Sequence, residues 1–377
     1  MATRLIIILT IYTGLQVYIG WHLDLFITVS GGQVPGAVFW PVFALVSLSY
    51  LFAMLLRKFL PKPVTTLLKW IGSYWIALMQ YSVLLLPVAD LAAWGMRAAS
   101  MTRQDSIVAS GWAVIAALVL IMARGSRNAW SPVVREYEVT IPKSAGSLKQ
   151  LRLAVASDLH LGMTVGRKHL QRLVDGVNAL KPDLVLLPGD VLDDAVEPFI
   201  RNHYAKQLAQ IKSKYGTYAV LGNHEYYGGG IDTYVQAMKE VGIPVMLDDH
   251  VLIGDSFHLI GRKDKTDHAR KNVAALVADL DTKLPIILMD HQPSAIREIA
   301  DGGVDLSLHG HTHKGQMAPN HLVTRRIFEL DYGYKHIAER LHAFVSSGFG
   351  TWGPPIRLGS RSEIWSITVN FTSHNNK

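Results

Sequence analysis

The first third of the chain contains four long stretches in which almost every side chain is apolar. They run from Leu5 to Val29, from Ala37 to Leu56, from Leu68 to Trp94 and from Ile107 to Ala123. A helix that crosses a bilayer needs about 20 such residues, so the pattern predicts four transmembrane helices in a domain of residues 1–123. The alternative is a buried helical bundle in a soluble protein, but four such runs with so few charges are unusual in water.

After residue 123 the pattern changes to short apolar runs that alternate with amphipathic segments. Residues 124–147 are predicted to be a connector leading to EYEVTIP, an alternating, strand-like run, and residues 148–377 a second domain. Buried strands are expected at LRLAVAS, DLVLLPG, TYAVLGN, LPIILMDH and VDLSLHGH, and another strand at SEIWSITVNF. Helices are expected at His169–Leu180, Phe199–Ile211, Tyr234–Val241 and Ser294–Ile299. This alternation predicts an α/β fold.

The distribution of charge marks the same boundary. Only ten of the 67 charged residues precede residue 124, and the formal net charge of +7 is divided between the two parts. The later part carries too little positive charge to predict nucleic-acid binding. Cysteine is absent, which excludes disulfides, thiolate zinc sites and cysteine nucleophiles.

Basic residues near the apolar runs predict the orientation of the membrane domain. With four spans, one side carries Arg4, Arg57, Lys58, Lys62, Lys69, Arg124 and Arg127, and the other carries only Arg97 and Arg103. Because basic loops stay inside, the second domain is expected in the cytoplasm. Asp90, His22 and Asp24 lie within or near the ends of apolar runs; such charges are often functional, but a position at the membrane interface is the favoured interpretation.

Polar side chains with metal-binding chemistry follow five of the predicted strands, within ASDLH, PGD, LGNHE, MDHQP and HGHTH. In open α/β sheets, ligands bind at the carboxyl ends of strands, so these side chains are expected to meet at one rim. The residues delivered there are Asp158, His160, Asp190, Asn223, His224, His291, His311 and His313.

Oxygen and imidazole donors of this kind suit divalent Mn, Fe or Zn. The donors are too many for one tetrahedral ion, and they suit two ions that share a carboxylate. Two metals about 3.5–4 Å apart can clamp the attacking and leaving oxygens of a displacement at phosphorus, with a water between them acidified to hydroxide. The G-x-S-x-G and P-loop patterns are absent from the sequence.

Together these motifs resemble those of the calcineurin-like metallophosphoesterases. That family's pattern runs D-x-H, G-D, G-N-H-[DE], H, G-H-x-H, and here it begins at Asp158 and ends at His313. The resemblance covers about Arg152 to Ile367. It implies a four-layer α/β/β/α sandwich, here preceded by the bundle of four transmembrane helices, with a site for two divalent metal ions.

The resemblance also implies a role for each residue. Asp158, His160 and His313 would hold the first metal, Asp190 would bridge, and Asn223, His291 and His311 would hold the second. His224 matches the catalytic residue that protonates the leaving oxygen, and Asp193 matches a position that can orient it. A general acid of this kind contributes about 10²–10⁴-fold.

Departures from the motifs of protein phosphatases indicate the substrate class. Asp194 and Glu225 stand where protein serine/threonine phosphatases have Arg and Asp. GHTHKGQ and SSGFGTWGPPIRLGSRSEI look like a membrane-associated bacterial branch, whose members resemble UDP-2,3-diacylglucosamine hydrolases. The expected protein is therefore a multi-pass enzyme of a bacterial inner membrane that contacts membrane lipids and hydrolyses a lipid-linked phosphodiester or pyrophosphate. The alternatives are a soluble-nucleotide phosphodiesterase tethered to the membrane, and a non-catalytic binding or scaffold protein.

Three further features allow two interpretations each. The basic segment GRKDKTDHARK is either a clamp for a diphosphate or lipid headgroup, or, the favoured interpretation, a solvated loop of mixed charge. Lys314 either meets a second phosphate or faces solvent. Tyr226 and Tyr227 either contact a substrate beside a mobile glycine-rich segment or belong to an ordinary turn.

Overall fold

The computed structural model describes residues 2–372 and divides them into two compact units. The first unit contains the described residues up to Ser126 together with Gly353–Ile356, and the second contains the remaining described residues.

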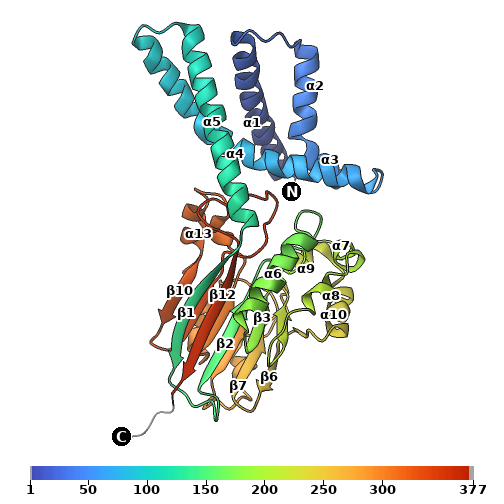
Figure 1. Cartoon of the computed structure of the whole chain (residues 1–377), viewed down its shortest axis with the longest axis vertical. Coiled ribbons are helices and arrows are strands. Elements are labelled where there is room, and N and C mark those ends of the chain that lie inside the picture. Colours follow the sequence, from blue (N-terminus) through green and yellow to red (C-terminus); the bar gives the residue numbers. More distant parts are fainter. Residues whose placement is uncertain (1, 373–377) are drawn as a thin grey trace. The chain divides into compact units, whose positions relative to one another are not determined.

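The first unit is helical (Figure 1). Its helices are α1 (Ala2–Val29), α2 (Gly36–Ser47), α3 (Ser49–Leu55), α4 (Lys62–Ala98) and α5 (Arg103–Trp130), the last of which continues into the second unit. Three of them, α1, α4 and α5, are long and apolar enough to cross a membrane. On α5, Val119 and Leu120 are 61% and 70% exposed, as expected of side chains that face lipid.

The span predicted from Ala37 to Leu56 is a bent pair of helices. The axes of α2 and α3 differ by 57°, so the chain has three candidate spans, or four if this pair makes one. On either side of the break, the Ser47 hydroxyl donates to the carbonyl of Ala44, and the Ser49 hydroxyl donates to the carbonyl of Val46. Hydroxyls that bond to the backbone in this way compete with the helical ladder and bend helices.

Within the first unit, α3 packs closely against α4 at Gly72. A Cβ atom on Gly72 would collide with the backbone of Tyr50, whereas a Cβ on Gly95 of the same helix would meet no atom within 4 Å. Small residues allow such close approach between apolar helices.

We expect Gly72→Ala to lower the free energy of unfolding by about 1–3 kcal/mol, because α3 must move to admit the methyl group. Gly95→Ala is the matched control and should be neutral or stabilise by up to about 1 kcal/mol, because alanine is the better helix former. Thermal unfolding of the full chain in detergent measures both. Equal shifts of Tm for the two variants would contradict the close packing at Gly72.

The second unit is built on two six-stranded sheets (Figure 1). The first sheet has the order β1-β12-β2-β3-β4-β5, formed by Val133–Ile141, Glu363–Phe371, Gln150–Val155, Leu184–Pro188, Thr217–Val220 and Val245–Met246. The second has the order β10-β11-β9-β8-β7-β6, formed by Gly333–Ile337, Leu341–Val345, Leu306–His309, Ile286–Met289, Phe257–Gly261 and Asp249–Ile253. Strand β1 lies inside the segment predicted to be a connector, and it pairs in parallel with β12 along its whole length.

Three apolar clusters hold these sheets and their helices together. One contains residues of both sheets, among them Leu186 of the first sheet and Leu308 of the second. Another joins the first sheet to the helices α6 (Arg167–Leu180), α7 (Val196–Arg201), α8 (Tyr204–Leu208) and α10 (Ile231–Glu240). The third joins the second sheet to α11 (Val273–Val277) and α12 (Ile296–Asp301). The domain therefore consists of two β-sheets with helices packed against them, and most of the strands are buried.

The helix predicted from Phe199 to Ile211 is interrupted. It is divided into α7 and α8, because Asn202 caps the first and His203 adopts a left-handed conformation with φ of 55°. Strands β5, β6, β7, β10 and β11 were not predicted. Three short elements complete the unit near the strand ends: α9 (Asn223–Gly228), the 3₁₀ turn η1 (His313–Gly315) and α13 (His321–Ile327).

Candidate metal centre

The side chains predicted to bind metal lie on loops that follow strands of both sheets. Asp158 and Asp190 follow β2 and β3, and Asn223 follows β4, whereas His291 follows β8 and His311 follows β9. The loops are joined through their backbones. The amides of Asp158 and His160 donate to the carbonyls of Gly189 and Asp190, each at 3.0 Å. The amide of His311 donates to Asp158 Oδ1 at 2.8 Å, which ties the second sheet to the first.

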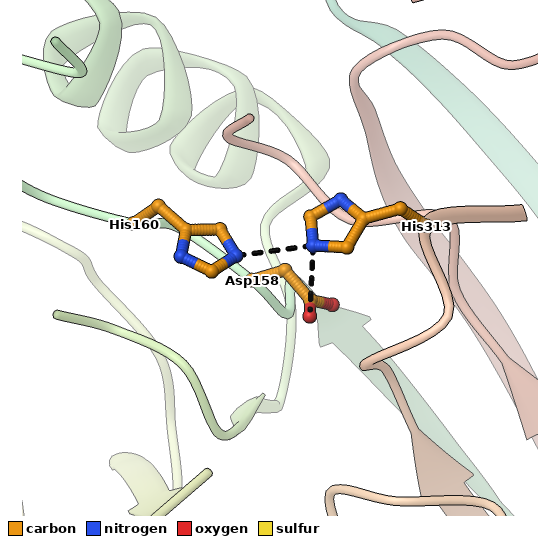
Figure 2. A group of neighbouring side chains, drawn as sticks. All are labelled: Asp158, His160 and His313. Atoms are coloured by element: carbon orange, nitrogen blue, oxygen red, sulfur yellow. Dashed lines mark hydrogen bonds and ion pairs between the residues drawn. The ribbon is translucent and has the colours of Figure 1, made fainter. Parts of the chain in front are cut away.

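One group of potential ligands consists of Asp158, His160 and His313, all of them buried (Figure 2). Their ligand atoms lie within 4.8 Å of one another. His160 Nε2 and His313 Nε2 face each other at 3.0 Å, and His313 Nε2 is 3.5 Å from Asp158 Oδ1. Two imidazole nitrogens and a carboxylate oxygen thus point at one small volume.

A second group consists of Asp190, His291 and His311. His291 Nε2 is 3.0 Å from Asp190 Oδ2, and His311 Nδ1 is 2.8 Å from Asn223 Oδ1. Asp190 Oδ2 is also 3.9 Å from His160 Nε2 of the first group. The structure therefore brings all seven predicted ligands together and places Asp190 beside both groups.

The electrostatics of this cluster favour bound cations. Burial lowers the pKa of His160 and of His311 to about 4, so both are neutral and have a free lone pair. Burial also disfavours the charged form of His291, but Asp190 and Asp158 outweigh it and raise the pKa of His291 well above its ordinary value. Two buried carboxylates are thus stabilised by nearby positive charge, and a bound divalent cation would supply it.

An unsatisfied polar atom also fits the metal hypothesis. His291 Nε2 is buried and makes no hydrogen bond of good geometry with any described residue, although Asp190 Oδ2 lies 3.0 Å away. Buried polar groups in native proteins normally have a partner, so an orphaned ring nitrogen that faces carboxylates is consistent with a ligand for an ion. The donor set of oxygen and imidazole nitrogen suits Mn, Fe or Zn.

Several of the ligand residues have unusual backbone conformations. Positive φ angles, which side chains other than glycine rarely adopt, occur at Asp158, His160, Asp190, His311 and His313. Such residues persist only where the surrounding structure over-determines them, and they cluster at functional sites. The backbone bonds between the loops supply that constraint.

His224 lies at the start of α9, beside both groups of ligands. Its Nδ1 is 2.6 Å from Asp194 Oδ1, and its ring meets that of His160 edge-on with centroids 4.7 Å apart. Burial opposes the charged imidazole, but the hydrogen bond to Asp194 and the nearby carboxylates outweigh it and raise the pKa of His224. The sequence motif pointed to Asp193 as the orienting carboxylate. Asp193 lies in the same group of potential ligands, but the short hydrogen bond is made by Asp194.

Two further buried residues support the site. Glu225 accepts hydrogen bonds from the amides of Asp190, Leu192 and Gly222, at 3.2, 2.8 and 2.6 Å. Burial raises the pKa of Glu225 to about 8. Arg357 is completely buried and donates to the carbonyls of Ser347 and Gly350, and its Nη2 is 3.2 Å from His313 Nδ1.

Glu225 belongs to the motif that identified His224, so its participation had a signal in the sequence. Arg357 lies within SSGFGTWGPPIRLGSRSEI, the segment that resembles the bacterial branch, but no pattern there assigned it to the site, and only the fold shows that it is buried beside a ligand.

The basic segment is not a solvated loop throughout. Arg262 is only 2% exposed and pairs with Asp290 at 3.3 Å and with Glu298 at 3.0 Å. Lys265 and Arg270 line a pocket of about 570 Å³, to which Arg297, Phe328 and the acidic residues Glu298 and Glu329 also contribute. The Phe328 ring is 5.9 Å from that of His311, so this pocket of mixed charge adjoins the metal centre. Lys314 stacks over the Tyr332 ring, with Nζ 4.4 Å from its centroid.

The polar residues predicted near the membrane interface are partly paired. In the first unit, Asp90 on α4 accepts from Tyr18 at 3.1 Å and pairs with His22 at 3.0 Å, both on α1. These contacts connect two helices and give Asp90 a structural role at this position.

Comparison with known proteins identifies the second unit. The family model described as calcineurin-like phosphoesterase matches residues 151–315, a range that contains every predicted ligand. A transmembrane protein with metallophosphoesterase domain from Danio rerio is 33% identical over 281 residues, which is 71% of this chain and 63% of that protein. An uncharacterized metallophosphoesterase from Campylobacter jejuni is 30% identical over 255 residues, 67% of each chain. The chain belongs to the calcineurin-like phosphoesterases.

This family membership accords with the fold and the site of the second unit. As a calcineurin-like phosphoesterase, the chain falls among metal-dependent hydrolases of phosphoesters, the class predicted from its motifs. A second transmembrane protein with metallophosphoesterase domain, from Bos taurus, is 30% identical over 274 residues, 68% of this chain and 61% of that protein. The chain thus spans between 61% and 67% of the length of these relatives. Its apolar helices agree with the names of the two vertebrate proteins, and its association with a membrane is supported.

Proposed function

We propose that this chain is a membrane-anchored enzyme that uses two divalent metal ions to hydrolyse a phosphodiester or pyrophosphate bond in a lipid-linked substrate. The observation that carries the proposal is the buried cluster in which Asp190 lies beside both groups of potential ligands. A shared carboxylate between two sets of oxygen and nitrogen donors is the arrangement that two metals acting on one phosphoryl group require.

In this proposal Asp158, His160 and His313 would hold one ion, and Asn223, His291 and His311 would hold the other. Asp190, which lies beside both groups, would contribute to both. When bound, the ions supply positive charge to the phosphoryl oxygens and make a water molecule acidic enough to attack phosphorus. The chain itself positions the ligands through the backbone bonds that join its loops.

The proposed role of His224 is to donate a proton to the leaving oxygen. Burial opposes the charged imidazole, but Asp194 and the nearby carboxylates raise the pKa of His224, which favours the protonated form that a general acid requires. With Nδ1 committed to Asp194, Nε2 is the nitrogen that faces the reacting group. Asp194 is the proposed positioning residue, and Asp193 contributes its charge from the same group.

A lipid-linked substrate is supported by the connection between the two units. Only Ser131 and Pro132 separate the end of α5 from the start of β1, so the phosphoesterase domain stays at the membrane that holds α5. In the pocket of mixed charge next to His311, Lys265 and Arg270 are the residues proposed to meet the second phosphate of a pyrophosphate. The proposed substrates therefore resemble those of UDP-2,3-diacylglucosamine hydrolases, in which a nucleotide is joined to an acylated sugar.

The proposed topology follows the sequence pattern. It has four spans, with α2 and α3 forming the second, and a phosphoesterase domain with a four-layer α/β/β/α sandwich. The proposed domains are residues 1–123 and 148–377, joined by residues 124–147, which also contribute strand β1 to the first sheet. The basic loops support a cytoplasmic location for the second domain. The proposed membrane for the helices of the first domain is the inner membrane of a bacterium.

The test compares two substrates that share one pyrophosphate bond, a nucleotide-linked acylated sugar and the same compound without acyl chains. The full chain is reconstituted in lipid nanodiscs with Mn, Fe or Zn supplied, and Asp190→Ala serves as the blank. We expect hydrolysis of both with a higher kcat/KM for the acylated compound. Hydrolysis of the soluble compound alone would favour a tethered nucleotide phosphodiesterase, and hydrolysis of neither with any metal would favour a non-catalytic protein.

A further inference from the structure

The described part of the second unit exposes its large apolar side chains very unevenly. On α13, Leu322, Val323 and Ile327 are 61%, 59% and 67% exposed. All seven residues of this helix are described and none of them is buried. Elsewhere in the described part of this unit, the single aromatic residues Tyr227 and Trp352 are 65% and 56% exposed, whereas the aliphatic residues Ile200 on α7 and Leu252 on β6 are only 39% and 42% exposed. Because apolar surface in water is unfavourable, this concentration on one short helix marks a contact surface.

The helix is fixed to the loop that carries two of the metal ligands. Thr312 donates to the carbonyl of Asp331 at 2.6 Å, and Thr324 of α13 donates to Asp331 Oδ2 at 2.7 Å. At the start of the helix, a Cβ on Gly315 would collide with the backbone of His321. The exposed face of α13 is therefore held at a fixed position relative to His311 and His313.

A pocket connects α13 with the metal centre. This pocket of about 320 Å³ is lined by Val323 and Thr324 of α13, by Trp352, and by His311 and His313. Trp352 is itself 56% exposed. The pocket thus extends from α13 to two of the proposed ligands.

Basic residues accompany the apolar ones on this helix. Arg325 and Arg326 are both exposed, and the nearest ion-pair contact of Arg325, to Asp331, is as long as 4.0 Å. A short helix with apolar and cationic side chains has the composition of segments that lie in the interface of an anionic bilayer. A bilayer is the partner argued for because the same chain has apolar helices long enough to cross one.

We infer that α13 and Trp352 form a membrane-contact surface that lies in the headgroup region of an anionic bilayer. Leu322, Val323 and Ile327 enter the acyl boundary, and Arg325 and Arg326 pair with lipid phosphates. The pocket beside His311 and His313 then receives its substrate from the plane of the membrane. This last step rests on the proposed function, whereas the contact itself does not.

The absence of cysteine from the chain makes a direct test possible. Single cysteines introduced as Leu322→Cys or Ile327→Cys are labelled with a nitroxide, and the full chain is reconstituted in nanodiscs of phosphatidylcholine and phosphatidylglycerol. We expect lipid-dissolved oxygen to relax these labels more strongly than a water-soluble nickel chelate does. Ile200→Cys and Leu252→Cys are matched controls and should show the opposite preference.

Three outcomes would overturn the inference. The first is access of the nickel chelate to the α13 labels equal to that in the controls. The second is dipolar broadening between labels of two chains, which would assign the surface to a second copy. The third is equal immersion in nanodiscs of phosphatidylcholine alone, or equal immersion of Arg325→Gln/Arg326→Gln, either of which would remove the pairing of arginine with anionic lipid.

Hydrolysis of soluble bis(p-nitrophenyl) phosphate by the same labelled chains separates this inference from the proposed function. We expect Leu322→Cys to hydrolyse it at the wild-type rate, because Leu322 lies outside the pocket. Immersed labels without any hydrolysis, wild type included, would support the contact and contradict the function. Hydrolysis by chains whose labels remain in water would support the function and contradict the contact.

Discussion

Asp190→Ala is expected to lose both metals and all metal-dependent hydrolysis, down to the rate that the wild type shows with excess chelator. The carboxylate of Asp190 lies 3.0 Å from His291 Nε2 and 3.9 Å from His160 Nε2, so its removal weakens both groups of ligands together. The measurements are metal content of the purified chain by elemental analysis and the rate of bis(p-nitrophenyl) phosphate hydrolysis with Mn.

Thermal unfolding gives this prediction a readout that is independent of activity. An ion that binds only the folded state stabilises it by about 2.7 kcal/mol at a free concentration of 100 Kd. Adding Mn should therefore raise the Tm of the wild type and leave that of Asp190→Ala unchanged. Asp175→Ala, on the exposed surface of α6, is the control and should behave as wild type. A variant without Asp190 that still binds two ions would contradict the shared carboxylate.

His224→Ala is expected to lower kcat by about 10²–10⁴-fold for substrates with an alcohol as the leaving group. An alkoxide is a poor leaving group and needs the proton that His224 supplies. The loss should be much smaller for a p-nitrophenyl ester, because p-nitrophenolate leaves without a proton. Parallel measurements of kcat for alkyl and p-nitrophenyl esters check this dependence, which a general loss of folding or of metal would not produce.

The two neighbouring carboxylates provide a matched pair for the same experiment. Asp194→Asn should show a smaller loss with the same dependence on the leaving group, because Asp194 makes the 2.6 Å hydrogen bond that orients His224. For Asp193→Asn the loss should depend less on the leaving group than it does for Asp194→Asn. If Asp193→Asn has the larger leaving-group effect, the assignment of the orienting residue to Asp194 is wrong.

Much of the second domain could be predicted from local patterns. The runs LRLAVAS, DLVLLPG, TYAVLGN, LPIILMDH and VDLSLHGH contain β2, β3, β4, β8 and β9, and these buried strands read as continuous apolar runs. The strands that escaped prediction include β5, which has two residues, and β6, whose residues are mostly exposed. Their pairing partners, rather than their own composition, decide their structure.

The sequence by itself determined the apolar helices of the first unit and the identity of the side chains that follow the buried strands. Both depend on periodicity and composition over a few residues, which fix local structure. They were enough to nominate seven ligands and the family to which the chain belongs.

Only the tertiary structure decided which groups meet. Asp194 adopts a φ of 58°, and its carboxylate reaches His224 where the motif pointed to Asp193. Arg357 becomes a buried partner of His313, 44 residues away in the chain. The exposure of the α13 side chains likewise depends on how the rest of the chain packs around this helix. Contacts between distant segments and the burial of a side chain are properties of the packed chain, so no short stretch of sequence contains them.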